Sequence, residues 1–331
     1  MINRIIVVRP YGYYGGTLVL DVLTKLLRDK GVDARIFYTP YSYINKSRSI
    51  KYIIRFWLDW LKITIKSLLP LLIKNSSIAF LNKRLDYYRR YYSDSMSGLR
   101  RQLFPFLQKG TLVVYPEVMY GNFLHAKNVI RWLLYYNRFQ NDKKWYNKND
   151  LFICYREIFN DWNLNPDGKC VCLSFFDANK YYQSNFGIRS GKCYIVRKGS
   201  IRSDLPAKFD GTIIDDLDEE EKVRILNQCQ YCYSYDTQTF YCTIAAVCGC
   251  IPVVVLEPGK SASDYLSPSE LNKSYGIAYG DSFEELKRAK DTRNLLLKSL
   301  DYETINNQNI IKFIAYVEGR FGDVCIGDVG M

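Results

Sequence analysis

The sequence predicts an α/β protein made of two doubly wound domains that face each other across a cleft. Three observations lead to this prediction. The chain has 331 residues, 48% of them hydrophobic, which is enough for about two domains that each bury a core. Short apolar runs typical of buried parallel strands recur along the chain, separated by segments with helical periodicity. A turn-rich stretch at residues 160–168 separates two groups of these runs and is the expected linker.

The first domain is expected at residues 1–160. It starts as strand, glycine-rich turn and helix, and Gly31 ends that helix before the next strand completes a right-handed βαβ unit. Its expected elements are strands at 3–9, 32–38, 111–117 and 151–155 and helices at 17–28 and around 126–136.

The second domain is expected at residues 161–302, with the same alternation of strands and helices. Its expected strands lie at 170–175, 193–197, 211–214, 230–234 and 251–256. A last helix at 303–321 is expected to follow this domain.

A basic insertion, residues 46–110, interrupts the first domain. It holds fourteen Lys and Arg against three Asp, so it carries +11 of the total net charge of +12. Residues 52–73 read as a Trp-bearing amphipathic helix broken near Pro70. Its charges are too many for a bilayer span, so contact with an anionic membrane surface is expected. A core-packing helical hairpin with a solvated basic face stays open, as does nucleic-acid binding through the tyrosine- and arginine-rich run at 87–92.

The cysteines and the N-terminus set expectations for compartment and metal. The apolar run at the N-terminus has four residues, too short for a signal peptide, so a cytoplasmic protein is expected. All ten cysteines lie at or after Cys154 and are expected to be reduced thiols. Cys229-x-x-Cys232 has no second pair at suitable spacing, and His125 is the sole histidine. A structural metal is therefore not expected.

Loops that follow the strands are the expected place for ligands. Gly15 and Gly16 would let backbone N–H groups approach an anion, although a tight turn without a ligand explains them as well. Arg197 and Lys198 follow a strand and suit a diphosphate, with a solvent-facing loop as the alternative. Beyond Tyr233, a strand ends in Ser234-Tyr-Asp-Thr237. The helix after it starts among hydroxyls that either bind phosphate or only cap the helix.

This last stretch, residues 233–255, resembles the second-domain signature of GT-B-fold glycosyltransferases that use nucleotide sugars. Asp236 occupies the first acidic position of the signature, and Ile244 stands at the second, where a Glu is usual. Thr243 is the neighbour expected to supply the missing contact. The turn Gly249-Cys-Ile-Pro252 is one residue longer than the common pattern.

Two further stretches, 115–134 and 275–280, are similar to family 4-like members from bacterial capsule and O-antigen clusters. The resemblance implies two Rossmann-like domains, with the nucleotide-sugar donor, UDP-linked by preference, on the second. The acceptor, a glycan or a polyprenyl-diphosphate-linked glycan, would lie on the first. The final helix would cross back to the first domain, and the enzyme would work on the inner face of the cell membrane.

The resemblance also implies roles for single residues. Asp236 and Glu117 would be catalytic: Asp236 would contact the transferred sugar, and Glu117 would position or deprotonate the acceptor hydroxyl, with Asn122 beside it. Retention of anomeric configuration is expected, without a metal or other cofactor. A non-catalytic nucleotide- or glycan-binding protein on the same fold is the alternative. The expected donor-binding residues are Gly15, Gly16, Arg197, Lys198, Ser234, Thr237, Thr239 and Thr243.

Overall fold

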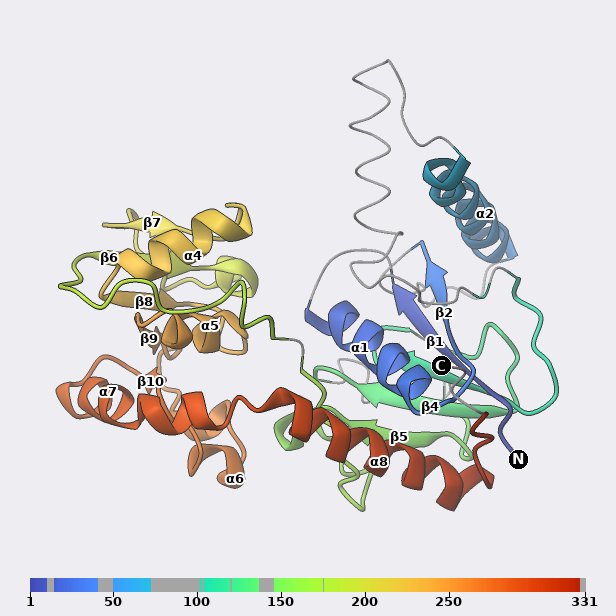
Figure 1. Ribbon diagram of the computed structural model, residues 1–331. Coiled ribbons are helices and arrows are strands. Elements are labelled where there is room, and N and C mark those ends of the chain that lie inside the picture. The colour runs from blue at the N-terminus through green and yellow to red at the C-terminus, as the bar shows by residue number, and fades with distance from the viewer. Residues whose placement is uncertain are drawn as a thin grey trace. The chain divides into compact units, whose positions relative to one another are not determined.

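The computed structural model describes residues 1–10, 15–40, 50–72, 102, 104–119, 121–136, 146–174 and 176–327. The chain divides into two compact units (Figure 1). Unit 1 comprises Met1–Phe175 and Glu303–Met331, and unit 2 comprises Phe176–Tyr302. Each unit has a five-stranded parallel sheet with flanking helices. The predicted α/β class with two Rossmann-like domains is confirmed.

The sheet of unit 1 has the strand order β2-β1-β3-β4-β5, and all its pairs are parallel. Because β2 and β3 lie on opposite sides of β1, the strand order reverses between β1 and β3. In such sheets ligands bind beyond the carboxyl ends of the strands at this reversal. The strands are β1 (Arg4–Pro10), β2 (Ala34–Thr39), β3 (Thr111–Pro116), β4 (Asn128–Leu133) and β5 (Leu151–Cys154).

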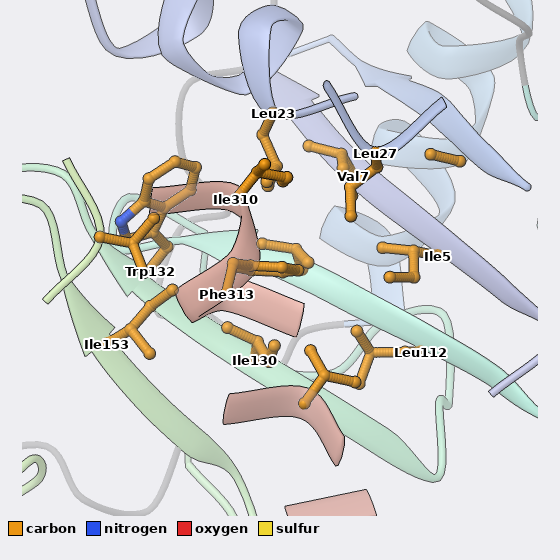
Figure 2. Close-up of a cluster of buried hydrophobic side chains, with 14 of the residues drawn as sticks. Ile5, Val7, Leu23, Leu27, Leu112, Ile130, Trp132, Ile153, Ile310 and Phe313 are labelled. Atoms are coloured by element: carbon orange, nitrogen blue, oxygen red, sulfur yellow. The ribbon is translucent and has the colours of Figure 1, made fainter. Parts of the chain in front are cut away.

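Alternate side chains of these strands enter two separate cores. Ile5 and Val7 face α1 (Gly15–Asp29) and α8 (Tyr302–Phe321), where Phe313 is fully buried (Figure 2). Val8 and the other face of the sheet pack against Trp57 and Trp60 of α2 (Ile50–Leu72). Both faces of the parallel sheet are therefore covered, which explains why its strands are near-continuous apolar runs.

The region around 126–136 was predicted to be helical, and this prediction is wrong, because its centre forms β4. Ile130 and Trp132 face the core shared with α1 and α8, whereas Val129 faces the opposite core. Arg131, which a surface helix would expose, is buried and ion-paired to Asp150 at 2.9 Å. Burial on both faces removes the alternation that identifies a strand in a sequence.

The helix α2 ends at Leu72, two residues after Pro70, near which a break was predicted. Its stacked ring contact between Trp60 and Phe37, with centroids 5.7 Å apart, holds it to β2. Among the described residues, no helix combines the length and apolar character needed to cross a bilayer. The tyrosine- and arginine-rich run at 87–92 lies outside the described residues.

The sheet of unit 2 has the strand order β10-β9-β8-β6-β7, so its order reverses between β6 and β8. One face packs on α4 and α5, and the other packs on α7. The elements are β6 (Lys192–Ile195), β7 (Thr212–Ile213), α4 (Glu219–Gln228), β8 (Tyr231–Ser234), α5 (Tyr241–Val247), β9 (Ile251–Val254), α6 (Pro268–Leu271), β10 (Ala278–Tyr279) and α7 (Phe283–Lys298). Short 3₁₀ helices are η2 (Glu157–Phe159), η3 (Arg197–Ile201) and η4 (Ala262–Asp264).

The units divide between Phe175 and Phe176, later than the predicted linker at 160–168. The strand predicted at 170–175 is replaced by an extended segment that makes one bridge, between Cys170 and Cys154. Its backbone bonds go to a helix instead: Ser174 N donates to Asn306 Oδ1 at 2.9 Å, and Asn306 Nδ2 donates to Ser174 O at 2.8 Å. The segment therefore belongs to unit 1, where α8 holds it.

Candidate functional site

The carboxyl edge of the unit 2 sheet begins with a strained turn after β6. Asp215, just beyond β7, accepts hydrogen bonds at Oδ2 from the backbone N–H groups of Val196 and Arg197, at 3.0 and 2.7 Å. These bonds hold Arg197 at a φ of 38°, in the left-handed region. Such a conformation is unfavourable for a residue with a Cβ, and strain of this kind concentrates at functional sites.

The Arg197 side chain is exposed at this edge and lies over the Tyr241 ring, 5.3 Å from its centroid. Within the described part of the chain, no carboxylate lies within 4.0 Å of its guanidinium. Lys198 is exposed next to it. The two cations therefore start η3 at the end of a strand, beside the reversal of strand order.

Tyr241 is itself firmly anchored. Its hydroxyl donates to Glu219 at 2.5 Å, and Glu219 also accepts from the Tyr181 hydroxyl and the Lys222 ammonium. Burial opposes ionisation of Glu219, but these hydrogen bonds and the Lys222 charge keep the pKa of Glu219 below its ordinary value. The ring under Arg197 is thus fixed by an ionised, fully engaged carboxylate.

Gly199 allows η3 to pack directly on the loop that follows β8. A Cβ at Gly199 would lie 2.3 Å from the carbonyl oxygen of Tyr235, which is closer than atoms can approach. Arg202 joins the same loops from below: its guanidinium donates to the carbonyls of Tyr235 at 3.3 Å and Val255 at 2.7 Å. Asp204 pairs with that guanidinium. The loops after β6, β8 and β9 are therefore tied into one edge.

The loop after β8 uses its predicted polar residues for its own geometry. Ser234 is fully buried, and its hydroxyl donates to the backbone oxygen of Asp236 at 2.8 Å. The buried Asp236 carboxylate accepts from Gln238 N at 3.2 Å. Thr239 Oγ1 accepts from Tyr241 N at 3.2 Å, and Thr237 is half-buried. These residues gather beside Arg197 as predicted for a donor edge, within a turn that they also stabilise.

The helix α5 explains the missing second acid of the signature. Ile244 is buried in the core between the sheet, α4 and α5, so an ionised carboxylate there would lose its hydration. Thr243, the predicted substitute, is half-buried one position earlier on α5. Cys242 lies on the buried side, where burial and the charge of Asp236 raise the pKa of its thiol to about 12.

The carboxyl edge of the unit 1 sheet carries the predicted Gly15 and Gly16 at the start of α1. A Cβ at Gly15 would meet nothing within 4 Å, and one at Gly16 would meet Leu134 at 3.5 Å. Arg9, at the end of β1, forms a buried bidentate pair with Asp21 of α1, at 2.7 and 3.1 Å. Residues 11–14 lie outside the described residues, so the loop itself has no described geometry.

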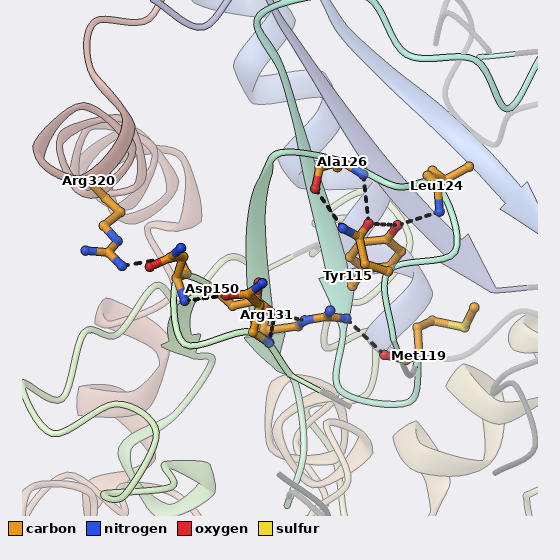
Figure 3. Close-up of polar contacts among 10 residues, drawn as sticks. Tyr115, Met119, Leu124, Ala126, Arg131, Asp150 and Arg320 are labelled. Atoms are coloured by element: carbon orange, nitrogen blue, oxygen red, sulfur yellow. Dashed lines mark hydrogen bonds and ion pairs between the residues drawn. The ribbon is translucent and has the colours of Figure 1, made fainter. Parts of the chain in front are cut away.

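Glu117 and Asn122, the predicted acceptor-side residues, both make backbone contacts in unit 1. Buried Glu117 accepts at Oε2 from Leu134 N at 3.0 Å, across the ends of β3 and β4. Asn122 closes the loop after β3, because its amide accepts from Ala126 N at 2.9 Å and donates to Ala126 O at 2.7 Å. The Tyr115 hydroxyl also donates to Asn122 Oδ1 (Figure 3). Asn122 therefore shapes this loop.

The sheet edges thus hold two separate groups of predicted residues, one in each unit. Sequence reasoning missed Asp215, Arg202 and Asp204, because each acts on backbone groups that are distant in the sequence. Among the described residues, no group of three or more His, Cys, Asp or Glu has the arrangement to hold a metal ion. The chemistry available at the unit 2 edge is that of two exposed cations, hydroxyls and a buried carboxylate.

Comparisons with known proteins give three structural similarities. The glycotransferase of kitacinnamycin matches with a TM-score of 0.37 and 9% identity, over 98% of this chain and 96% of that one. MurG from Acinetobacter baumannii matches with 0.26 and 11%, over 93% and 94%. An alpha-glucosyltransferase in complex with UDP matches with 0.34 and 11%, over 96% of each chain. No protein-family model and no curated protein matches the sequence. All three TM-scores are below 0.5, so the case for function rests on the chain's own residues.

Proposed function

We propose that this chain is a glycosyltransferase that moves a sugar from a nucleotide-sugar donor, UDP-linked by preference, to a hydroxyl of a glycan or lipid-linked glycan. The resemblance of residues 233–255 to the donor-binding signature of these enzymes supports the proposal. So does the position of the matching residues at the carboxyl edge of the unit 2 sheet, where Rossmann-like domains bind nucleotides.

The single observation that carries the proposal is the geometry of Arg197. The chain spends backbone strain to hold an exposed guanidinium, without a described carboxylate partner, at the reversal of strand order. A diphosphate provides the bidentate acceptor that such a group lacks. With Lys198 it would neutralise the charge that develops on the departing nucleoside diphosphate, a role that needs no metal.

The remaining roles follow the same edge. Thr237 and Thr239 would contact the diphosphate oxygens, and Asp236 would contact the transferred sugar. Thr243 would take the place of the missing Glu toward the ribose. On the acceptor side, Glu117 would position or deprotonate the hydroxyl after its bond to Leu134 N is exchanged.

A nucleotide panel tests the donor site. Melting of the purified chain is measured with UDP, GDP, CMP and dTDP, each with and without Mg²⁺. A ligand at about 100 times its Kd adds about 2.7 kcal/mol, a shift of several degrees. We expect UDP to give the largest shift, independent of metal, and Arg197→Ala/Lys198→Ala to lose it. No shift with any nucleotide, in a chain that melts cooperatively, contradicts the donor site.

We also propose that α2 brings the enzyme to the cytoplasmic face of the cell membrane. A stripe of apolar side chains along α2 is about half exposed or more, while Phe56 on the other side is buried in unit 1. Exposed Lys51, Arg55 and Lys62 accompany the stripe and would attract anionic lipid. The stripe consists of Ile50, Ile54, Leu58, Leu61 and Ile65.

Vesicle binding tests this role. We expect Ile54→Ser/Leu58→Ser to weaken binding to vesicles containing phosphatidylglycerol without lowering Tm, because both side chains are exposed. The matched control is Ile311→Ser, which removes an equally exposed apolar residue from α8. Equal binding by the double variant and the control contradicts membrane docking through α2.

Stereochemistry gives an independent test of the family placement. Asp236 at the first acidic position favours a retaining enzyme of surface-polysaccharide synthesis, in capsule or O-antigen assembly. Proton NMR of the isolated product is expected to show the anomeric configuration of the donor sugar. An inverted product contradicts the retaining mechanism, although not the donor site.

One observation favours a second function, a non-catalytic nucleotide- or glycan-binding protein. The carboxylates of Glu117 and Asp236 are both buried and both accept backbone hydrogen bonds. A chain that binds UDP tightly but releases no UDP from UDP-sugars, with or without membrane extracts, would match this second function.

A further inference from the structure

A pocket of about 400 Å³ lies at the amino-terminal edge of the unit 2 sheet. Gln230, Cys250 and Gly276, which precede β8, β9 and β10, contribute to its walls. Because the strands are parallel, this edge is the opposite one from that of Arg197. The pocket is therefore separate from the proposed donor site.

Two arginines in the pocket wall are held by the ends of two helices. Arg189 donates to Leu226 O at 2.9 Å and to Cys248 O at 2.6 Å. Arg293 of α7 donates to Ala246 O at 2.6 Å and to Val247 O at 3.0 Å. These carbonyls end α4 and α5, so both guanidiniums are fixed before any ligand arrives.

The turn after α5 is shaped around one of these guanidiniums. Gly249 has a φ of 89°, and a Cβ there would lie 2.5 Å from Nη2 of Arg189. A residue other than glycine would have to displace the arginine. The close approach of the chain here keeps Arg189 in the pocket wall.

The charge of the pocket is uncompensated. Its lining includes Arg189, Arg293 and the exposed Lys290 but no Asp or Glu. In the described chain, no carboxylate lies within 4.0 Å of any of the three, and Nε of Arg189 and Nη1 of Arg293 donate no hydrogen bond. Burial and the charge of Arg189 lower the pKa of Arg293, as expected for two cations without an anion between them.

We propose that this pocket binds a small phosphorylated anion at a site distinct from the donor site. Its volume lies in the range of small-molecule pockets. Fixed guanidiniums with spare donors, next to a flexible ammonium, match the oxygens of a phosphate or diphosphate. The inference uses none of the residues assigned to the donor and does not rest on the proposed function.

Calorimetric titration with inorganic pyrophosphate tests the pocket. The Arg197→Ala/Lys198→Ala variant serves as the background, so that the proposed diphosphate site does not contribute. In that background, Lys290→Glu is expected to weaken binding about five- to tenfold, because it reverses one exposed charge at the ligand. Lys287→Glu makes the same change on an exposed position of α7 outside the pocket, and less than a twofold effect is expected.

A second change keeps the test independent of one side chain. Asn294→Asp adds a negative charge to the pocket lining and leaves both arginine contacts in place. It too is expected to weaken pyrophosphate binding severalfold. Absence of binding, equal loss in Lys290→Glu and Lys287→Glu, or unchanged binding in both pocket variants would each overturn the proposal.

Discussion

Arg197 combines a cost in stability with a proposed gain in binding. Its backbone is held in the left-handed region by Asp215, and one oxygen of that carboxylate, Oδ1, is buried without a hydrogen bond among the described residues. A residue placed only for folding would be expected to avoid both costs. Folding and donor binding should therefore respond differently to substitution here.

We predict that Arg197→Gly keeps or raises the Tm while it abolishes the shift produced by UDP. Glycine adopts a positive φ without the cost of about 1 kcal/mol that a Cβ brings, but it supplies no cation. Arg197→Lys keeps a charge and is expected to retain part of the UDP shift. A large fall in Tm for Arg197→Gly would show that the side chain stabilises the fold instead.

Gly199 gives a second prediction at this scale. We expect Gly199→Ala to lower the free energy of unfolding by about 1–3 kcal/mol, because its Cβ would collide with the backbone of Tyr235. Gly319→Ala is the matched control: its Cβ has open space and it lies within α8, so it should raise stability by about 0.5–1 kcal/mol. Urea unfolding of both variants measures the difference, and equal effects would contradict the close packing at Gly199.

The residues that could be predicted were those next to a strand end in the sequence, such as Arg197 and Asp236. Asp215 and Arg202 could not be found in this way. Each acts on main-chain atoms brought near by the sheet: Asp215 on Val196, and Arg202 on Val255. No local pattern distinguishes such a side chain from an ordinary loop residue.

Among the elements, most strands could be predicted, because a parallel strand buried on both faces is an apolar run. The same property misassigned β4, whose residues suit a buried helix equally well. Only the burial of Arg131 in a pair with Asp150 decides the matter, and that contact depends on the fold. The segment at 170–174 failed for a different reason, since its partners are side chains of α8.

The helix α1 depends on a buried ion pair that fixes it to β1. We predict that Asp21→Asn lowers the free energy of unfolding by about 3 kcal/mol, because Arg9 then stays buried without its counter-charge. Asp29→Asn removes the exposed pair with Lys25 at the other end of α1 and should cost less than about 0.5 kcal/mol. Chemical denaturation compares the two; similar losses would contradict the burial of Arg9 and Asp21.

Across the whole molecule, the cysteines couple stability to alkaline pH. Burial raises the pKa of Cys242 to about 12 and that of Cys248 to about 11, whereas a thiol in the unfolded chain ionises near pH 8.5. Above that pH the unfolded state loses protons that the folded state keeps, so stability must fall as pH rises. The slope is about 1.4 kcal/mol per pH unit for each thiol held neutral.

We therefore expect stability, measured in urea with a reducing agent, to decline between pH 8.5 and 10. Cys242→Ala should lower stability at pH 8 but show a shallower decline, since one titrating thiol is gone. A slope unchanged by Cys242→Ala would mean that this thiol is not held neutral in the folded chain.

The central claim is that the carboxyl edge of the unit 2 sheet binds the nucleoside diphosphate of the donor. Amide hydrogen exchange with and without saturating UDP tests this most directly, because it locates the ligand on the chain. The account predicts slower exchange in residues 196–201 and 236–243, which include Arg197 and Asp236, and little change at the opposite edge near Gln230 and Cys250. Protection confined to other segments, or no protection at a UDP concentration that saturates the thermal shift, would contradict it.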